Sequence, residues 1–223
     1  GANAGMRVGP GAIFGSWLAA ILGMATKDGE ALLAVKYRGK DEKGQMAGGP
    51  MYYLERGLKQ KWLAVLFAFF GVIASFGIGN GTQSNSVAGV VSNTFNVAPW
   101  ITGIVLTVVV GLVILGGISS IGSVTAVFVP VMAIFYLLAG LIVIFTNIKD
   151  VPAARGIIVK DAFSFSGAGG GRVGAAIRYG VARGIFSNEA GLGSAPIAAA
   201  AAKTDLPGRQ ALISMTQVFL DTI

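Results

Sequence analysis

The chain has 223 residues, among them 17 Lys and Arg and 10 Asp and Glu, with no Cys and no His. No charged residue occurs between Trp62 and Ile148. About a quarter of the residues of a soluble domain are charged, so a run of this kind could not build a surface that faces water. The composition excludes a soluble domain over this region and predicts a protein that lies in a lipid bilayer.

The missing residue types limit the chemistry that the chain can perform. Without Cys or His there is no thiolate nucleophile, no imidazole base and no disulfide framework, and an ordinary zinc or haem site is excluded. The basic residues lie between apolar segments rather than along one stripe, so we expect no nucleic acid partner. Their placement is typical of signals that orient membrane spans.

Apolar segments of about 20 residues are candidate membrane spans. The first candidate span begins at Pro10 and ends before Lys36. Turn-forming stretches divide the uncharged run into three further candidate spans. A polar stretch follows, then a segment interrupted by glycines and charges, and last an apolar stretch too short to cross. The predicted spans are 10–35, 62–91, 100–115, 124–146, a broken span at 172–202 and a partial span at 211–223.

The loop at residues 36–61 carries many more basic than acidic residues, which predicts that it lies in the cytoplasm. We therefore expect a multi-pass protein of the plasma (inner) membrane, in contact with the lipid bilayer. The chain begins at Gly1 rather than Met and its last span is half-length, so we expect a fragment of a longer protein. Residues 1–223 are predicted to form a single transmembrane domain.

A polar cluster at residues 80–86 lies inside the second predicted span. Amide side chains in hydrocarbon need partners, so they should face other helices or a water-filled cavity. At about 100° per residue, Asn80 and Gln83 share one helix face. The hydroxyl residues of the cluster are best interpreted as helix-packing groups. We predict a binding role for the two amides, because each can both donate and accept hydrogen bonds.

A second candidate lies at residues 184–194, where glycines flank Asn188 and Glu189. Such a segment is poor material for a continuous spanning helix and favours a broken one. Free N–H groups of the second half would attract an anionic group, and free carbonyls of the first half a cation or ammonium. The alternative is a re-entrant or extramembrane linker in which Arg183 pairs with Glu189.

Lys27 and Glu30 are the third candidate, late in the first predicted span. Their spacing of three places them on one helix face. We interpret them as a structural ion pair near the cytoplasmic boundary, where such a pair contributes little to stability.

Four stretches of the chain together resemble the alanine or glycine:cation symporter family. They are GPGAIFGSWLAAILGMATKDGEALLAVKYR at 9–38, GGPMYYLERGL at 48–58, FGIGNGTQSNS at 76–86 and RGIFSNEAGLGSAPIA at 183–198. The resemblance implies an all-α membrane protein: a polytopic helical bundle with the five-plus-five inverted-repeat transporter fold, truncated at both ends. The first and sixth helices of that fold are broken at mid-membrane, and our five spans would be helices two to six.

The resemblance also implies an activity, namely uptake of alanine or glycine driven by a Na⁺ gradient through alternating access. It implies no cofactor, no catalytic residue and no enzymatic reaction, with Na⁺ as the coupling ion. Gln83 matches the polar substrate contact of the third helix, Asn80 lies one turn away, and Phe186 matches the apolar residue that closes over a small side chain. The expected substrate-binding residues are Asn80, Gln83, Phe186, Ser187, Asn188, Gly191 and Gly193.

Two departures from the family pattern limit what these residues can do. Gly1–Met6 is a poor match to the G-N-I-A-G run of the family's first helix, and the helix expected to complete the ion site is missing. We therefore expect the sodium ligands mainly in helices outside this sequence, and we expect these residues alone not to transport.

The alternatives are another small amino acid, proton coupling, or a structural or channel-like membrane subunit. A membrane-embedded enzyme using Glu189 as acid or base would need a second catalytic group, and neither His nor Cys is available.

Overall fold

The computed structural model of the protein describes residues 9–77, 80–163 and 171–222. Its regular elements are helices apart from one small antiparallel hairpin. They are α2 (Gly11–Tyr37), β1 (Gly39–Lys40), β2 (Met46–Ala47), α3 (Pro50–Arg56), α4 (Lys61–Ser75), α5 (Gly81–Phe95), α6 (Pro99–Leu115), α7 (Gly117–Thr146), α8 (Val151–Ala162), α9 (Gly171–Asn188), α10 (Ala195–Ala200) and α11 (Pro207–Thr222).

Two of the predicted spans differ from the helices observed. The range 62–91, predicted as one span, contains α4 and α5 with residues 76–80 between them. The physical reason is the sequence G-I-G-N-G at 77–81, because glycine and asparagine are both poor helix formers. The helix predicted over 124–146 begins earlier, at Gly117, and the stretch 147–171, predicted as a polar loop, contains α8.

Two parts of the family pattern lie outside the described residues, namely Gly1–Met6 and, within the stretch 76–86, Ile78 and Gly79. Helices α2 and α6 follow the predicted ranges 10–35 and 100–115 closely, and α11 begins a turn before the predicted 211–223.

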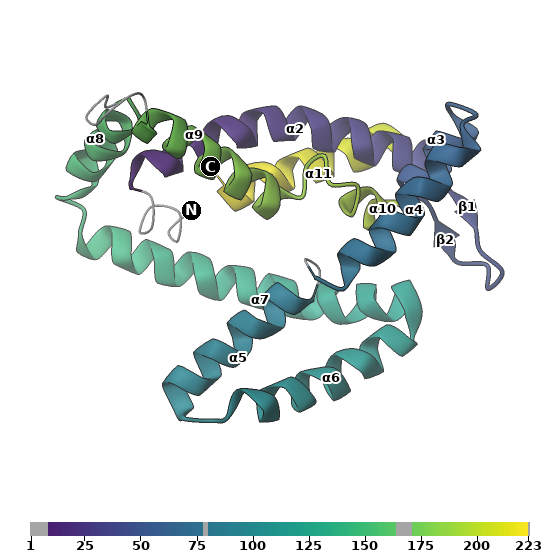
Figure 1. Ribbon diagram of the computed structural model, residues 1–223, viewed down its shortest axis with the longest axis horizontal. Coiled ribbons are helices and arrows are strands. Elements are labelled where there is room, and N and C mark those ends of the chain that lie inside the picture. The colour runs from purple at the N-terminus through teal and green to yellow at the C-terminus, as the bar shows by residue number, and fades with distance from the viewer. Residues whose placement is uncertain (1–8, 78–79, 164–170, 223) are drawn as a thin grey trace.

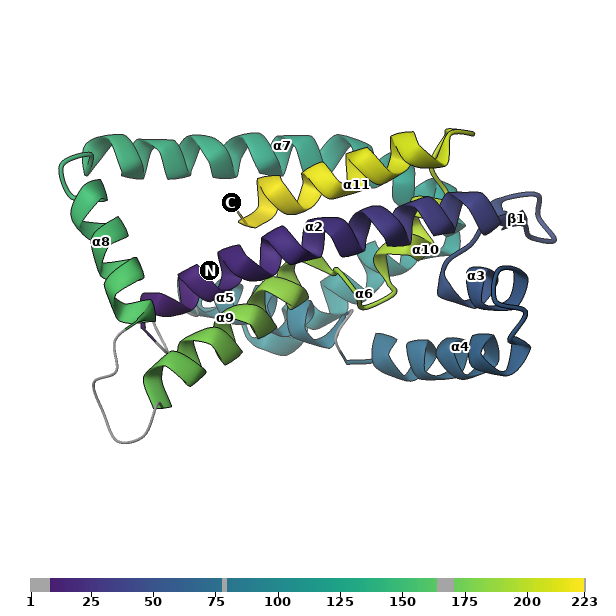
Figure 2. The same ribbon diagram turned by 90° about the horizontal axis from the view of Figure 1, so that it is seen from above.

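Helix α2 is the centre of a bundle with α9, α10 and α11 (Figures 1 and 2). Its buried face is made almost entirely of small residues. A Cβ atom added to Gly184 of α9 would lie 2.7 Å from Cβ of Ala19, and one added to Gly180 would clash with the carbonyl oxygen of Ala12. Ser16 Oγ donates a hydrogen bond to the Gly180 carbonyl at 3.0 Å. Small residues at four-residue spacing let the two backbones approach closely, as in membrane helix pairs.

Polar side chains from neighbouring elements satisfy the ends of the bundle helices. Asp161 Oδ2 of α8 accepts a hydrogen bond from the Gly11 N–H at 2.8 Å, at the beginning of α2. Arg38, just after α2, donates to the carbonyls of Ala200 at 3.0 Å and Ala202 at 2.7 Å, where α10 ends. Helix ends leave N–H and C=O groups without partners, so these contacts hold α8 and α10 against the two ends of α2.

Helices α4 to α7 are packed quite differently. Figure 1 shows α5, α6 and α7 in an arc that lies apart from the bundle. Ala64 of α4 and Thr102 of α6 are buried, whereas α5 and α7 have no buried residue. Among the described helices, α7 is the one both long and apolar enough to cross a membrane, and α4 and α6 are shorter apolar helices. Crossing by the other predicted spans stays a prediction.

Candidate functional site

The predicted broken span does contain a break, because α9 ends at Asn188 and α10 begins at Ala195. Three residues between them have positive φ angles: +52° at Glu189, +82° at Gly191 and +79° at Gly193. Glycine adopts this left-handed region freely, whereas other residues seldom do. The two glycines therefore allow the turn that ends α9, and the turn frees backbone groups on both sides of the break.

A lysine from α2 binds the carbonyl group at the end of α9. Lys27 Nζ donates to the Asn188 carbonyl oxygen at 2.7 Å, and only 3% of the Lys27 surface is exposed. A buried ammonium is costly without a partner, and the last carbonyls of a helix carry partial negative charge. The protein's own ammonium thus takes the position at which the sequence predicted a bound cation or ammonium.

Glu30, one helical turn further along α2, binds the other side of the break. Its Oε2 atom accepts a hydrogen bond from the Gly191 N–H at 3.2 Å. In the part of the chain that the structure describes, the ion pair found is Arg38–Asp205, so our interpretation of Lys27 and Glu30 as an ion pair is wrong. Both charges go to backbone groups instead, because a broken helix exposes partial charges of both signs close to α2.

Glu189 lies within the break, and its contacts differ from those of one alternative that the sequence left open, a pair with Arg183. Its Oε2 atom accepts a hydrogen bond from Ser194 Oγ at 3.1 Å. Over residues 9–77, 80–163 and 171–222, no ion pair joins Arg183 to Glu189. The alternative in which that pair supports a linker therefore receives no support from the geometry.

Asn188 is the buried amide of the break, with 3% of its surface exposed. Its Oδ1 atom accepts a hydrogen bond from Thr222 Oγ1 at 2.7 Å, at the end of α11. Its Nδ2 atom has no hydrogen-bond partner among the described residues. A Cβ atom added to Gly23 of α2 would lie 3.8 Å from this nitrogen and 3.3 Å from Cβ of Ala190. Buried amide donors are nearly always bonded, so Nδ2 is a polar group that the described residues leave unsatisfied.

The other predicted residues of this segment surround Asn188 along the chain. Ser187 Oγ donates to Asp221 Oδ2 at 2.5 Å, which ties the end of α9 to α11. Phe186 is 37% exposed in the last turn of α9. Gly193 is buried, and a Cβ atom there would lie 2.6 Å from Cζ of Phe67 in α4. The structure therefore gathers all the predicted residues between 186 and 193 at the break.

Asn80 and Gln83, predicted as the second wall of the site, lie elsewhere. Asn80 directly precedes α5 and Gln83 is in its first turn, and both are exposed. Ser84 Oγ donates a hydrogen bond to the Asn80 carbonyl oxygen. Figure 1 shows α5 in the arc, apart from α9 and α10, so the structure does not bring these two amides to the break. Their binding role stays a prediction.

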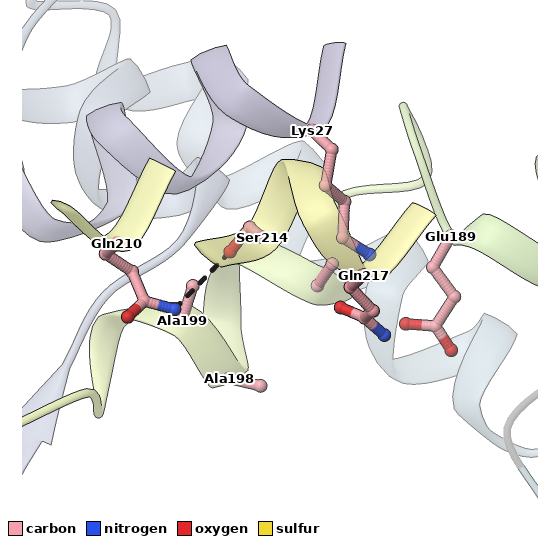
Figure 3. A pocket seen from close by; sticks show the side chains of 8 residues that line it. Lys27, Glu189, Ala198, Ala199, Gln210, Ser214 and Gln217 are labelled. Atoms are coloured by element: carbon pink, nitrogen blue, oxygen red, sulfur yellow. Dashed lines mark hydrogen bonds between the residues drawn. The ribbon is translucent and has the colours of Figure 1, made fainter. Parts of the chain in front are cut away.

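A cavity of about 260 Å³ lies beside the break, between α2, α10 and α11 (Figure 3). Lys27 extends into it from α2, and alanines of α10 form its apolar side. Its polar lining consists of Lys27, Glu189, Gln210, Ser214 and Gln217. The carboxylates of Glu189, Glu30 and Asp221 all act on the Lys27 ammonium, so negative charge predominates around the break.

Within the described ranges, no group of three or more Asp, Glu, His or Cys residues is placed to hold a metal ion. The expectation that sodium ligands lie mainly in other helices therefore stays a prediction.

The predicted cytoplasmic loop reaches the site through Tyr53 of α3. Burial raises the pKa of the Tyr53 phenol to about 12, and the negative charge of Glu30 adds to the rise. The phenol therefore stays neutral at physiological pH.

Sequence reasoning missed the part that Lys27, Glu30 and Thr222 play at the break. For the first two a signal was available, because charged residues inside an apolar segment are functional candidates by default. No pattern in the sequence marks Thr222, which reaches Asn188 only through the packing of α11 against α9.

The model of the sodium:alanine symporter family matches residues 2–223 of the chain. The chain belongs to this family. It is 60% identical to the sodium/alanine symporter AgcS of Methanococcus maripaludis, over 96% of this chain and 48% of that protein. It is 45% identical to the probable sodium/glutamine symporter GlnT of Bacillus subtilis, over 96% of this chain and 45% of that protein. It is 44% identical to the putative sodium/proton-dependent alanine carrier protein YrbD of the same organism, over 96% of this chain and 44% of that protein.

Family membership confirms the resemblance seen in the four sequence stretches. The three relatives are named as sodium symporters or as an amino acid carrier, and none of those names is that of an enzyme. The chain spans about half the length of the curated relatives it matches.

Proposed function

We propose that this chain forms part of a secondary active transporter that takes up a small amino acid, alanine or glycine, together with Na⁺ by alternating access. Asn188 carries the proposal, because it lies buried at the break with its Nδ2 donor unused by the described residues. In inverted-repeat transporters, substrate and coupling ion bind where helices are discontinuous. Family membership and the relatives named for alanine and sodium support the same assignment.

A small zwitterion suits the break in charge and in size. Asn188 Nδ2 would donate to the substrate carboxylate, and the excess of negative charge around the break suits an ammonium group and a sodium ion. Phe186, about a third exposed, would close over the side chain of the substrate. A methyl group or a hydrogen fits under such a lid better than a long side chain.

The setting belongs to the proposal as well. We place the protein in the plasma membrane as a multi-pass protein, with loop 36–61 in the cytoplasm and the five-plus-five repeat as its complete fold. The length and hydropathy of α7 support a membrane crossing, as do the large apolar side chains exposed along α4, α6 and α7. No cofactor is required.

The test is uptake of labelled alanine by the full-length protein in liposomes. We expect an inward Na⁺ gradient to drive accumulation, and we expect unlabelled glycine to compete better than unlabelled glutamine. Uptake that ignores the Na⁺ gradient but follows a proton gradient would overturn the assignment of the coupling ion. Competition by glutamine that matches competition by alanine would overturn the size argument.

Substitutions of Asn188 test the site itself. Asn188→Asp keeps the oxygen that accepts from Thr222 and removes the Nδ2 donor, whereas Asn188→Ala removes both. A hydrogen bond to a charged group contributes about 1.5–3 kcal/mol, so we expect KM for alanine to rise about 10- to 100-fold. Asn147→Ala is the matched control, because Asn147 is exposed at the end of α7. Equal KM values for Asn188→Ala and Asn147→Ala would contradict the proposal.

A further inference from the structure

Two charged side chains of α2 bind backbone groups on the two sides of the break. Lys27 Nζ binds the carbonyl of Asn188, the last residue of α9, at 2.7 Å. Glu30 Oε2 binds the N–H of Gly191, inside the turn, at 3.2 Å. Residues three apart lie on the same helix face, so one face of α2 contacts the chain before and after Glu189.

The signs of the charges match the groups that they bind. The carbonyl at the end of α9 carries partial negative charge and receives an ammonium, whereas a free N–H of the turn donates to a carboxylate. Hydrogen bonds to ionised groups are shorter and stronger than those between neutral groups. Exchanging the two side chains would place like charges together, so the order Lys27 then Glu30 fits the direction of the chain through the break.

The backbone between these two contacts is the part that most needs support. Glu189 has a φ of +52°, and a non-glycine residue persists in that region only where its surroundings hold it. Close packing fixes α2 against the same segment, since Gly23 lies against Ala190 and Ala19 against Gly184. Helix α2 is therefore a rigid base from which Lys27 and Glu30 reach the break.

We infer that Lys27 and Glu30 are positioning residues, a two-point brace that sets the backbone of residues 188–191 and thereby aims the Asn188 amide. The effect on substrate rests on the proposed function, whereas the brace is a property of the chain itself.

The first test needs no substrate and uses the full-length protein. Residues 1–223 contain no Cys, so a single reporter can be placed at Ala190, which is only 7% exposed within the braced segment, once any Cys elsewhere is replaced. The readout is the rate at which a hydrophilic maleimide labels Ala190→Cys. We expect Lys27→Met and Glu30→Met each to raise this rate at least about fivefold, because local opening of the segment becomes easier.

Conservative variants and a remote variant serve as controls for the labelling rate. Lys27→Arg and Glu30→Gln retain a donor and an acceptor respectively, so we expect each to label more slowly than its Met counterpart. Lys36 is exposed in the last turn of the same helix, and we expect Lys36→Met to label at the parent rate. If Lys27→Met does not fold, Glu30→Gln against Glu30→Met still decides the matter. Equal labelling of the parent and both Met variants, in well-folded protein, would overturn the brace.

Transport separates positioning from general stability. A brace predicts that Lys27→Met and Glu30→Met raise KM for alanine at least about tenfold, with a smaller loss of maximal uptake per folded protein. A purely structural role would lower the amount of folded protein with KM unchanged, and that result would overturn the inference. If the parent does not transport alanine at all, the proposed function fails while the labelling rates still decide whether the brace exists.

Discussion

The bundle around α2 and the arc of α5, α6 and α7 are both helical, yet they pack in opposite ways. The buried face of α2 is made of small residues that touch α9, whereas the arc exposes large apolar side chains over most of its length. Small residues let helix backbones meet, and that contact is what builds the bundle. Large side chains on the arc offer surface to lipid or to helices outside these residues. Residue size and hydropathy therefore both separate the two regions, since α6 and α7 contain no charged residue whereas α2, α9 and α11 each contain charged residues.

The largest change in Tm is expected for substitution of Gly184 in the bundle, and Gly140 of the arc is the comparison. In Gly184→Leu the new side chain meets Ala19 at once, because a Cβ atom there already lies 2.7 Å from Cβ of Ala19. Overpacking of this kind costs about 1–3 kcal/mol or more, so we expect a large fall in Tm and in folded yield. A Cβ atom added to Gly140 has no neighbour within 4 Å, so Gly140→Leu should leave Tm unchanged. Thermal unfolding in detergent measures Tm for both variants. An equal fall in Tm would contradict the difference in packing between the two regions.

A smaller effect is expected at Arg38, which closes the bundle at the end of α10. Arg38→Met loses hydrogen bonds to the carbonyls of Ala200 and Ala202 and the ion pair with Asp205. Hydrogen bonds to charged groups contribute about 1.5–3 kcal/mol, and part of that is returned by solvent, so we expect a moderate fall in Tm. Arg155→Met on the exposed face of α8 is the matched control. A fall in Tm no larger than that of Arg155→Met would show that this contact does not hold the bundle.

The smallest effect is expected for Gln83→Ala, which tests whether the arc contributes to substrate binding. Gln83→Ala removes an exposed amide of α5 and should leave Tm unchanged. If Gln83 contacts a charged group of the substrate, water can replace much of the lost hydrogen bond because Gln83 is exposed. We then expect a net loss of about 0.5–1.5 kcal/mol and a rise of about two- to tenfold in KM for alanine. Uptake kinetics at several alanine concentrations check the result. An unchanged KM would restrict the site to the bundle.

Much of this division could be predicted from the sequence, because apolar length sets helix length in a bilayer. The uncharged run predicts the helices α6 and α7, and the glycines beside Asn188 and Glu189 predict the break. The separation of α4 from α5 was not predicted, because the sequence stays free of charged residues through the short G-I-G-N-G stretch and into α5.

The partners of the charged residues were harder to predict. Lys27 and Glu30 satisfy the spacing of an ion pair within α2, and only the packing of α2 against α9 shows that backbone groups of the break lie closer. The partners of Asn188 depend likewise on α11, which follows in the chain but whose contact with α9 is a tertiary one. Local pattern thus predicts where a helix breaks, and tertiary contacts decide what holds the break.

The central claim is that alanine binds at the break when Na⁺ is present. The most direct measurement is protection of Leu192→Cys from maleimide in the full-length protein, with alanine added in Na⁺ or in K⁺. We predict that alanine slows labelling at least about fivefold in Na⁺, has no effect in K⁺, and loses its effect in the Asn188→Ala background. Labelling that alanine leaves unchanged in Na⁺, at concentrations that saturate uptake, would contradict the assignment of the substrate site to Asn188.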